Sequence, residues 1–481
     1  MNLNQTLQEK YPHLEVSVLK LSEAQKDNES FRIDSEPFKK SNLYTNTNLS
    51  YEKLSNIADI NPSKAEINNF SKDAIVTFLS MQNLGSGFIH HREQGQIVEF
   101  ENGYTYFAEN DILIAKITPC MEHGKCAIAT DLYNGIGFGS TEFNVFRIRD
   151  PRFLTEFVFC YLNRDSIRKI ATDNMVGTSG RQRVPTAFYE KLPIPILPIE
   201  FQLEIQNLVK DSHKALEESK ELYKKAEETL YLELGLDPKN PLQSLLDSKI
   251  DHSIKSLNIS IRTLKESFLK TGRLDSEYYQ KKYEINEKII MNKKYTVLDN
   301  LVSITKSIEP GSNLYKNKGI PFIRVANLTQ YGLSEGDVFL DEKDFFPQYL
   351  QILYPKKDTI LFSKDGSVGI AYCVKEDKEV ITSGAILHLN IKDKENILPE
   401  YLTLFLNSIF VKLQAQRDCG GSIISHWRIE DIKKVLVAIL DIKIQEKIAK
   451  YIQESFNLRR KSKQLLDNAK NKVEEQIQGK T

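Results

Sequence analysis

The chain contains one sequence pattern twice, about 243 residues apart. The clearest copies are "LPIPILPIEFQLEIQNLV" at 192–209 and "VLVAILDIKIQEKIAKYI" at 435–452, where an apolar run becomes helical at the same glutamine, Gln202 and Gln445. Upstream, "RIDSE" (32–36) matches "RLDSE" (273–277), and "LTEFVFCYLN" (154–163) matches "LPEYLTLFLN" (398–407). A repeat this long is a whole folding unit and not the short repeat of a solenoid, so the sequence predicts two similar domains.

Strand patterns come first in each copy. "DILIAKI" (111–117) and "DTILFSK" (358–364) are short apolar runs, and "AILHLNI" (385–391) alternates apolar and polar residues. One amphipathic helix is expected in each copy, at about 154–171 and 398–416, followed by a Gly-Ser loop and a last apolar strand. We therefore expect an α+β fold built as a tandem duplication.

A long helix follows each globular part. Residues 200–234 contain no Gly or Pro, and the pattern stops at Gly235 with Pro238 just beyond. Its apolar and small residues keep a heptad rhythm that recurs 243 residues later, which is typical of a coiled coil. The residues expected to pair the two helices are Ile205, Leu208, Leu222 and Leu230 in the first and Ile448, Tyr451, Leu465 and Val473 in the second.

Charge indicates that the two helices pair with each other. Residues 200–234 carry nine acidic and five basic residues, whereas 443–481 carry five acidic and ten basic ones. Antiparallel pairing would separate the globular parts along a rod of roughly 50 Å, at about 1.5 Å per residue. The predicted domains are a first globular domain (1–199), a helix (200–234), a linker (235–257), a second globular domain (258–442) and a C-terminal helix (443–481).

Composition narrows the class of protein. A chain of 481 residues, 41% hydrophobic, is too long for one core, and its apolar runs are far shorter than the roughly 20 residues of a membrane span. The five cysteines are irregularly spaced, as in reduced intracellular proteins. We therefore expect a cytoplasmic protein without membrane contact. Lys plus Arg equals Asp plus Glu at 65 each, which excludes a wholly basic DNA coat.

Motifs for catalysis are missing from the sequence. "GIGFG" (135–139) continues into another extended segment instead of opening a helix, so we interpret it as a turn and not as a cofactor loop. The tetrapeptide that holds a flipped base in amino-methyltransferases is absent, "NPSK" (61–64) being the nearest match, and neither HExxH, GxSxG nor a P-loop occurs. We expect neither catalytic residues nor a cofactor in this chain.

One cluster has the residue types of a zinc site. Cys120, His123 and Cys126 are evenly spaced, and His90 with His91 could add a ligand. The matching segment of the second copy, "DGSVG" (365–369), contains neither Cys nor His. We favour small buried thiols over a metal.

A polar loop precedes the last strand of each copy: "GTSGRQRVP" (177–185) and "GGSIISHWR" (420–428). Small residues of such loops can bind phosphates, and Arg, Gln and His side chains can read base edges, although a plain surface turn is the alternative. The long side chains differ between the copies, as expected of two readers of different sequences. The candidate DNA-binding residues are Thr178, Ser179, Arg181, Gln182 and Arg183 in the first loop and Ser422, Ser425, His426 and Arg428 in the second, with Ser80, Gln82, Asn83, Lys116, Arg324, Asn327 and Lys364 as further candidates.

Taken together, the duplication, the helices and the helix entry resemble the specificity subunit of a type I DNA restriction-modification system. "IPILPIEFQ" (194–202) is similar to the family's Ile-Pro-Leu-Pro-Pro-Leu-x-x-Gln signature, whereas "VAILDIKIQ" (437–445) has lost the prolines. The resemblance implies a non-catalytic protein whose two target-recognition domains each read one half of a split site in double-stranded DNA, while the helices set the gap. It also implies two methyltransferase subunits that bind S-adenosylmethionine, and in some complexes restriction subunits that use ATP and Mg.

Two other classes stay open at this point. A fused restriction-modification enzyme uses the same recognition module, but its catalytic motifs should lie within the chain. A coiled-coil scaffold that does not bind DNA would explain the helices, yet it needs no pair of similar domains with divergent loops. Methylation by the isolated chain would favour the enzyme, and capture of a methyltransferase partner would disfavour the scaffold.

Overall fold

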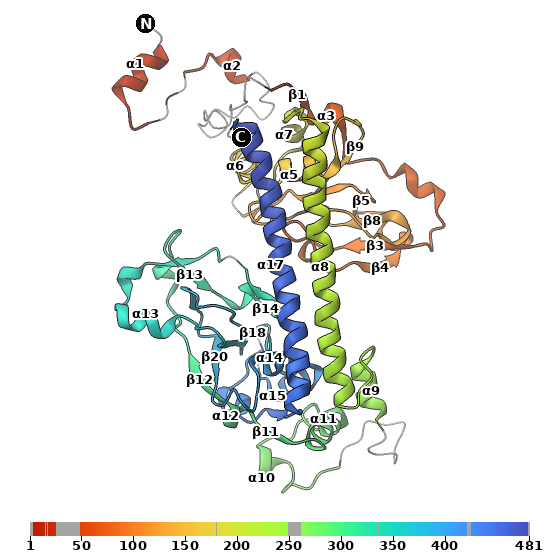
Figure 1. Cartoon of the computed structure of the whole chain (residues 1–481), viewed down its shortest axis with the longest axis vertical. Helices are drawn as coiled ribbons and strands as arrows, with labels where there is room; N and C mark the ends of the chain where they lie inside the picture. The colour runs from red at the N-terminus through yellow and green to blue at the C-terminus, as the bar shows by residue number, and fades with distance from the viewer. Residues whose placement is uncertain are drawn as a thin grey trace. The chain divides into compact units, whose positions relative to one another are not determined.

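The computed structural model describes residues 3–14, 16, 18–25, 49–178, 180–248, 261–334, 336–420 and 425–479. The described chain mixes helices and strands, so the predicted α+β class is confirmed at that level. It forms two compact units, residues 1–216 with 460–481 and residues 217–459, and each is described by itself. Figure 1 shows their elements, with α8 in yellow-green and α17 in blue. None of the described helices is long and apolar enough to cross a membrane.

The described residues of the first unit form two four-stranded sheets and a two-stranded pair. The sheets have the orders β2-β9-β6-β7 and β4-β3-β8-β5, in which only β3 and β8 run parallel, and β1 pairs with β10. The strands are β1 (Tyr51–Lys53), β2 (Ala58–Ile60), β3 (Ile75–Leu79), β4 (Glu93–Gln96), β5 (Thr105–Ala108), β6 (Ile112–Ala115), β7 (Cys126–Ile128), β8 (Ile136–Gly139), β9 (Phe143–Ile148) and β10 (Pro193–Pro195).

The second unit repeats this strand order. Its main sheet is β12-β20-β17-β18, a second sheet β16-β13-β19 again contains one parallel pair, and β11–β21 and β14–β15 are two-stranded. The strands are β11 (Tyr295–Val297), β12 (Val302–Lys306), β13 (Ile320–Ile323), β14 (Leu328–Thr329), β15 (Gly332–Leu333), β16 (Phe339–Leu340), β17 (Ile360–Ser363), β18 (Ala371–Cys373), β19 (Ile381–Thr382), β20 (Ile386–Ile391) and β21 (Leu436–Ala438).

The helices cover the main sheets and extend beyond them. In the first half of the chain they are α1 (Leu3–Lys10), α2 (Leu21–Gln25), α3 (Leu54–Ile57), α4 (Ile97–Phe100), α5 (Thr155–Leu162), α6 (Asp165–Asp173), α7 (Thr186–Lys191) and α8 (Ile199–Glu233), with 3₁₀ turns η3 (Lys64–Asn69), η4 (Met81–Asn83) and η5 (Tyr133–Gly135). In the second half they are α9 (Pro241–Asp247), α10 (Phe268–Thr271), α11 (Lys281–Met291), α12 (Leu298–Leu301), α13 (Pro347–Leu353), α14 (Pro399–Asn407), α15 (Ile409–Asp418), α16 (Ile429–Ile432) and α17 (Ile442–Gln478), with η6 (Ser312–Leu314), η7 (Val325–Asn327) and η8 (Glu342–Asp344).

Each amphipathic helix expected as one piece is broken into two, which corrects the prediction. The first breaks between α5 and α6 at Asn163 and Arg164, and Arg164 has extended backbone angles. The second breaks at Ser408, whose hydroxyl donates to the carbonyl of Phe405 at 2.6 Å. Asn and Ser form such local hydrogen bonds with the backbone, which favours a helix end over its continuation.

The glycine cluster at 135–139, expected as a turn, lies mostly in strand β8. This strand is central in its sheet, between β3 and β5. A Cβ atom on Gly137 would stand 2.4 Å from the ring of Phe107, and one on Gly139 would stand 2.7 Å from the carbonyl oxygen of Leu79. The glycines therefore allow neighbouring groups to approach the strand closely, and this is why they interrupt an apolar run without ending it.

Part of the segment expected to be a linker is ordered. Within 235–257, α9 inserts Leu245 into the core of the second unit, and residues 249–257 lie outside the described residues. That core runs from the main sheet through Tyr401 of α14 to Tyr223 of α8 and Ile448 of α17. The core of the first unit likewise extends from its sheet onto the portions of α8 and α17 that belong to it.

Candidate nucleic-acid interface

The first polar loop is fixed to the end of strand β6 by backbone hydrogen bonds. Val176 and Arg183 exchange two N–H···O bonds of 2.9 Å, which closes the base of the loop. The next residue, Val184, donates to the carbonyl of Lys116 at 2.9 Å, and the amide of Lys116 donates to the carbonyl of Glu142 at 2.9 Å. These backbone bonds join the loop, the end of β6 and the segment before β9, and we call this arrangement the loop frame.

The second unit contains the same frame at equivalent positions. Gly420 and His426 exchange backbone bonds of 3.1 and 2.8 Å, Trp427 donates to the carbonyl of Lys364 at 2.8 Å, and Lys364 donates to Ala385 at 2.9 Å. Strands β6 and β17 thus bring a lysine and a polar loop together in both units, as the shared order of sequence features predicts.

The side chains that secure each loop differ between the units. In the first unit Arg183 holds Glu142 through both carboxylate oxygens, at 2.6 Å from Nη2 and 2.8 Å from Nε. The equivalent of Glu142 in the second unit is Ala385, and there His426 pairs instead with Asp365, which also accepts from Lys364. A carboxylate that binds a nitrogen of the loop is therefore kept in each frame, although both members of the pair have changed.

The Arg183 guanidinium also sets the ionisation of its partner. Its hydrogen bonds hold the pKa of the Glu142 carboxyl below the usual range, and they outweigh the opposing effect of partial burial. Glu142 is therefore a carboxylate near neutral pH. It neutralises Arg183, so this arginine anchors the loop in the free protein.

Other candidate side chains point to solvent. Thr178 and Arg181 are exposed, and within the described part of the chain the Arg181 guanidinium has no ion pair. Gln182 is half-buried and Ser425 is exposed. Arg428 is 74% exposed, and its Nε donates to Asp431 at 2.7 Å. Ser179 and Ser422 lie outside the described residues.

The candidate DNA-binding residues in and beside the 3₁₀ turn η4 differ in whether their side chains bind within the protein or face solvent. Asn83 is engaged within the protein, since its amide donates to Ser80 Oγ at 3.0 Å and to Glu93 at 2.7 Å. Ser80 also donates to Glu93, at 3.3 Å, whereas Gln82 is exposed. Asn83 therefore stabilises the turn, and Gln82 is the side chain of the turn that is exposed to solvent.

The equivalent turn of the second unit is braced in the same way. Asn327 accepts from the amide of Arg324 at 3.1 Å, and Arg324 Nη2 lies 2.6 Å from Asp337. Each turn also adjoins the loop frame, because Ser140 donates to the carbonyl of Leu79 at 3.2 Å in the first unit. The corresponding bond in the second unit runs from Ser383 to Ile323 at 2.8 Å.

Sequence reasoning missed the carboxylates that hold the loops. Glu142 and Asp365 lie 41 and 61 residues from their partners, so no local motif marks them. Aligning the repeats could have found them, because Ala385 stands where the first repeat has Glu142 and Asp365 where it has Ile117. An acidic residue that is absent at one aligned position and present at another indicates that the partner of the loop has changed between the repeats.

The suspected zinc cluster has no metal-binding geometry among the residues that the structure describes, where no three possible ligands come together. Cys126 is buried in strand β7, and burial raises the pKa of its thiol. Cys126 is therefore a neutral thiol within the core, whereas Cys120 is partly exposed.

The helix residues expected to pair divide into two groups. Ile205, Leu230, Ile448 and Val473 are buried, whereas Leu208, Leu222, Tyr451 and Leu465 are half-buried; the residue that follows each of these four, Val209, Tyr223, Ile452 and Leu466, is buried instead. The shift occurs at equivalent places in both helices. A straight α-helix turns every 3.6 residues, so the buried face drifts from a strict heptad over two turns.

Buried serines connect α8 and α17 within each unit. In the first unit Ser212 Oγ donates to the carbonyl of Ser462 at 2.7 Å and lies 3.1 Å from its Oγ. In the second unit Ser455 Oγ donates to the carbonyl of Ser219 at 2.8 Å and lies 3.0 Å from its Oγ. Because Ser455 and Ser462 are the repeat equivalents of Ser212 and Ser219, both units use the same contact with the helices exchanged.

Comparison with known proteins identifies a protein family that the chain resembles. Residues 297–470 match the family model described as the Type I restriction modification DNA specificity domain. Two curated relatives from Escherichia coli match over 154 residues, 32% of this chain: the Type I restriction enzyme EcoAI specificity subunit at 36% identity and the EcoEI specificity subunit at 34%. The match covers 26% and 25% of these relatives, so it spans about a quarter of their length.

Solved structures match along most of the chain at low identity. The HsdS subunit from Thermoanaerobacter tengcongensis aligns with 91% of this chain and 98% of its own, at 16% identity and a TM-score of 0.31. The S subunit of a type I restriction-modification system from M. genitalium aligns with 89% of this chain and 97% of its own, at 14% identity and a TM-score of 0.38. The family match over residues 297–470 and the two curated relatives confirm the resemblance drawn from the sequence, which is to the specificity subunits of type I restriction-modification systems.

Proposed function

We propose that this chain reads DNA sequence for a type I restriction-modification complex and performs no catalysis itself. Each unit, as a target-recognition domain, reads one half of a split site in double-stranded DNA. The observation that carries the proposal is the repeated loop frame, in which the backbone bonds at Lys116 and Lys364 recur while the long side chains are exchanged. A fixed frame with variable polar side chains suits two readers of different sequences.

The charge of the frame supports contact with DNA. Lys116 and Lys364 each end a strand beside a loop whose tip carries exposed polar side chains, including Thr178 and Arg181 in the first unit and Ser425 in the second. Lys116 is partly exposed and would contact a phosphate, whereas Lys364 is buried and paired with Asp365, so it would hold the second frame and not bind DNA directly. Side chains such as Arg181 and Arg428 would reach base edges. Arg183 and His426 secure the loops through Glu142 and Asp365.

We propose that α8 and α17 pair as an antiparallel coiled coil that sets the gap between the half-sites. The exchanged serine contacts, Ser212 with Ser462 and Ser219 with Ser455, support this arrangement, because they follow from one antiparallel register. Opposite charge balances on the two helices support it as well.

The partners follow from the same proposal. Two methyltransferase subunits would dock on the helices and their surroundings, bind S-adenosylmethionine and methylate adenine. Restriction subunits that use ATP and Mg would join where the system has them. This chain would hold no cofactor of its own, and the complex would act in the cytoplasm.

Mapping of adenine methylation across a genome tests the proposal. Cells would express type I modification subunits with this chain, with a chain carrying Arg181→Ala, or without it. A split motif that requires the chain, and that loses definition in one half with Arg181→Ala, is the expected result. Methylation of the same motif without the chain would refute the proposal, and methylation by the chain alone would favour a fused enzyme.

A further inference from the structure

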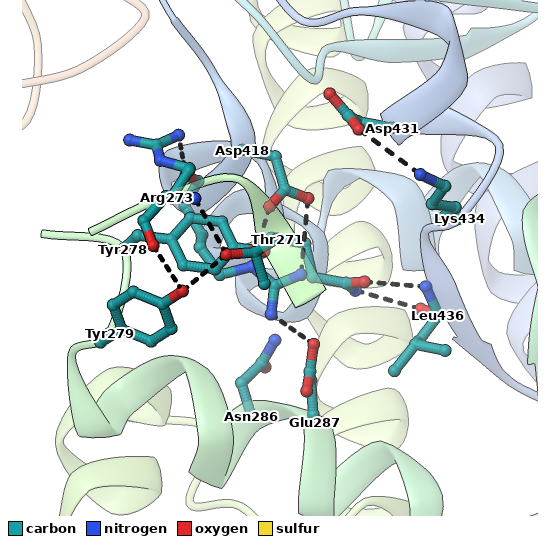
Figure 2. A network of polar contacts seen from close by, with 12 residues as sticks. Thr271, Arg273, Tyr278, Tyr279, Asn286, Glu287, Asp418, Asp431, Lys434 and Leu436 are labelled. Atoms are coloured by element: carbon teal, nitrogen blue, oxygen red, sulfur yellow. Dashed lines mark hydrogen bonds and ion pairs between the residues drawn. The ribbon is translucent and has the colours of Figure 1, made fainter. Parts of the chain in front are cut away.

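A segment ahead of the second sheet, residues 271–279, lies across the end of helix α15. It contains the "RLDSE" sequence (273–277), and the matching "RIDSE" at 32–36 lies outside the described residues. The Arg417 guanidinium, one residue before the end of α15, stands 5.4 Å from the centre of the Tyr278 ring, and the Arg273 guanidinium stands 4.8 Å from the same ring. Figure 2 shows Arg273, Tyr278 and Asp418 gathered at this place.

The segment is braced by its own polar contacts. Arg273 holds both carboxylate oxygens of Asp275 at 2.7 Å. The hydroxyl of Tyr279 donates to the carbonyl of Arg273 at 3.0 Å and lies 2.6 Å from Thr271 Oγ1. The segment therefore presents the Tyr278 ring in a defined position and not as part of a loose strand.

Arg417 joins this segment to the body of the unit. It forms an ion pair with Glu287 of α11, and its Nε donates to Asp418 at 2.8 Å. The side chains of Arg417 and Asp418 are only 17% and 14% exposed. A cation with so little water around it binds an aromatic ring more strongly than an exposed one does.

The second recognition loop begins directly after this pair. Gly420, two residues beyond Asp418, closes the loop by its backbone bonds with His426. The other stem of the loop carries Asp431, which accepts from Arg428 at 2.7 Å and lies 3.9 Å from Lys434. An ion-paired carboxylate therefore stands next to each end of the loop, and the segment 271–279 contacts the first of these pairs through Arg417.

We propose that Arg273, Tyr278 and Arg417 are positioning residues for the second recognition loop, so that the segment 271–279 determines how sharply this loop discriminates bases. The proposal rests on the function proposed above, since it assigns these residues to the same reading site. None of the three needs to touch DNA. Their role is to fix the backbone at Asp418, and with it the orientation in which the loop begins at Gly420.

Substitution of the ring tests this role. Tyr278→Leu removes the aromatic face that both guanidinium groups contact, whereas Tyr278→Phe keeps it. Comparing the two variants therefore measures the contribution of the ring alone. The full-length chain would be assayed in competition between a duplex with the split motif found by methylation mapping and duplexes changed at one base pair in either half. We expect Tyr278→Leu to lower discrimination in the second half about fivefold, with the first half unchanged and Tyr278→Phe close to wild type.

The single tryptophan of the chain provides the folding control. Trp427 is fully buried at the loop stem, so its emission reports whether the core beneath the loop survives the substitution. Should Tyr278→Leu shift this emission to that of an exposed indole, Tyr279→Phe replaces it, because loss of one hydroxyl leaves the ring packing in place. A smaller loss, again confined to the second half, is expected from Tyr279→Phe.

The outcomes separate this proposal from the function on which it rests. Unchanged discrimination in the second half, an equal loss in both halves, or a Tyr278→Phe chain as poor as Tyr278→Leu overturns the positioning role. A wild-type chain that produces no split motif overturns the proposed function itself. A wild-type motif together with an unaffected Tyr278→Leu chain overturns the positioning role alone.

Discussion

Gln202 and Gln445 make the same three hydrogen bonds in their respective units. The side-chain oxygen of Gln202 accepts from the amide of Leu154 at 2.9 Å, and its nitrogen donates to the carbonyls of Arg152 and Leu197, both at 2.9 Å. Gln445 accepts from Leu398 at 3.0 Å and donates to Asn396 at 3.2 Å and Leu440 at 2.9 Å. Each glutamine thus ties the start of a long helix to the start of the sheet-covering helix, which explains its recurrence.

Replacement of this glutamine should loosen one unit and leave the other intact. Gln202→Leu leaves an amide and two carbonyls without their partner, and each such group costs about 1–3 kcal/mol when buried. We expect the free energy of unfolding of the first unit to fall by about 3 kcal/mol. Hydrogen exchange should rise at Leu154 but not at Leu398, and Gln445→Leu should give the reverse.

Gln206→Leu is the matched control, since Gln206 is half-buried on the same helix and its side chain donates to that of Glu156, at 2.9 Å. We expect it to cost less than about 1 kcal/mol. Equal exchange at Leu154 in the two variants would contradict a special role of Gln202.

Arg181 and Arg183 should respond differently to substitution, although they are neighbours in one loop. Arg181→Ala removes an exposed side chain, so binding should weaken about tenfold at the first half-site without a change in thermal stability. Arg183→Ala should also release the loop from Glu142, which trypsin cleavage after Arg181 would report as a faster rate. Arg428→Ala is the reciprocal control, because it should affect the second half-site alone.

Acid should release the first loop only below the ordinary pKa range of a glutamate. Because the Arg183 contact lowers the pKa of Glu142, the folded loop is favoured fully above the unfolded value, and the gain is lost as the pH falls through the lower folded value. Between about pH 5 and 8 the protection of residues 176–184, corrected for intrinsic exchange rates, should stay constant. In Glu142→Gln it should already be reduced at neutral pH, and equal protection in both chains would rule out the anchor.

The sequence made some features predictable because they depend on local pattern. The repeat, the strand runs, both ends of α8 and the start of α17 are of this kind, since apolar spacing and Gly235 mark them directly. The helix breaks at Asn163 and Ser408 depend on single polar residues within apolar runs, and they were missed. The pairs Arg183 with Glu142 and His426 with Asp365 depend on contacts made only after the sheets form.

The register of the helix seam offers a direct comparison of sequence and structure. The heptad predicts Leu465 at the seam, whereas Leu466 is 3% exposed and Leu465 half-buried. Leu466→Ala should therefore lower the free energy of unfolding of the first unit by about 2–5 kcal/mol. Leu465→Ala should cost about 1 kcal/mol. Chemical denaturation of the two variants measures the difference, and a larger cost for Leu465 would restore the strict heptad.

Lengthening both helices by one heptad should widen the gap between the half-sites. Repeating residues 212–218 in α8 and 455–461 in α17 adds one more serine pair between Ser212–Ser462 and Ser219–Ser455, and it keeps the serine contact of each unit. Seven residues add about 10 Å, which is about three base pairs of duplex.

Methylation mapping should then return the same two half-sites with a longer gap. Insertion into α8 alone is the control, because it breaks the serine register and should abolish the motif. An unchanged gap with both insertions would mean that the DNA spacing is set elsewhere, and the paired helices would then serve only to hold the chain together.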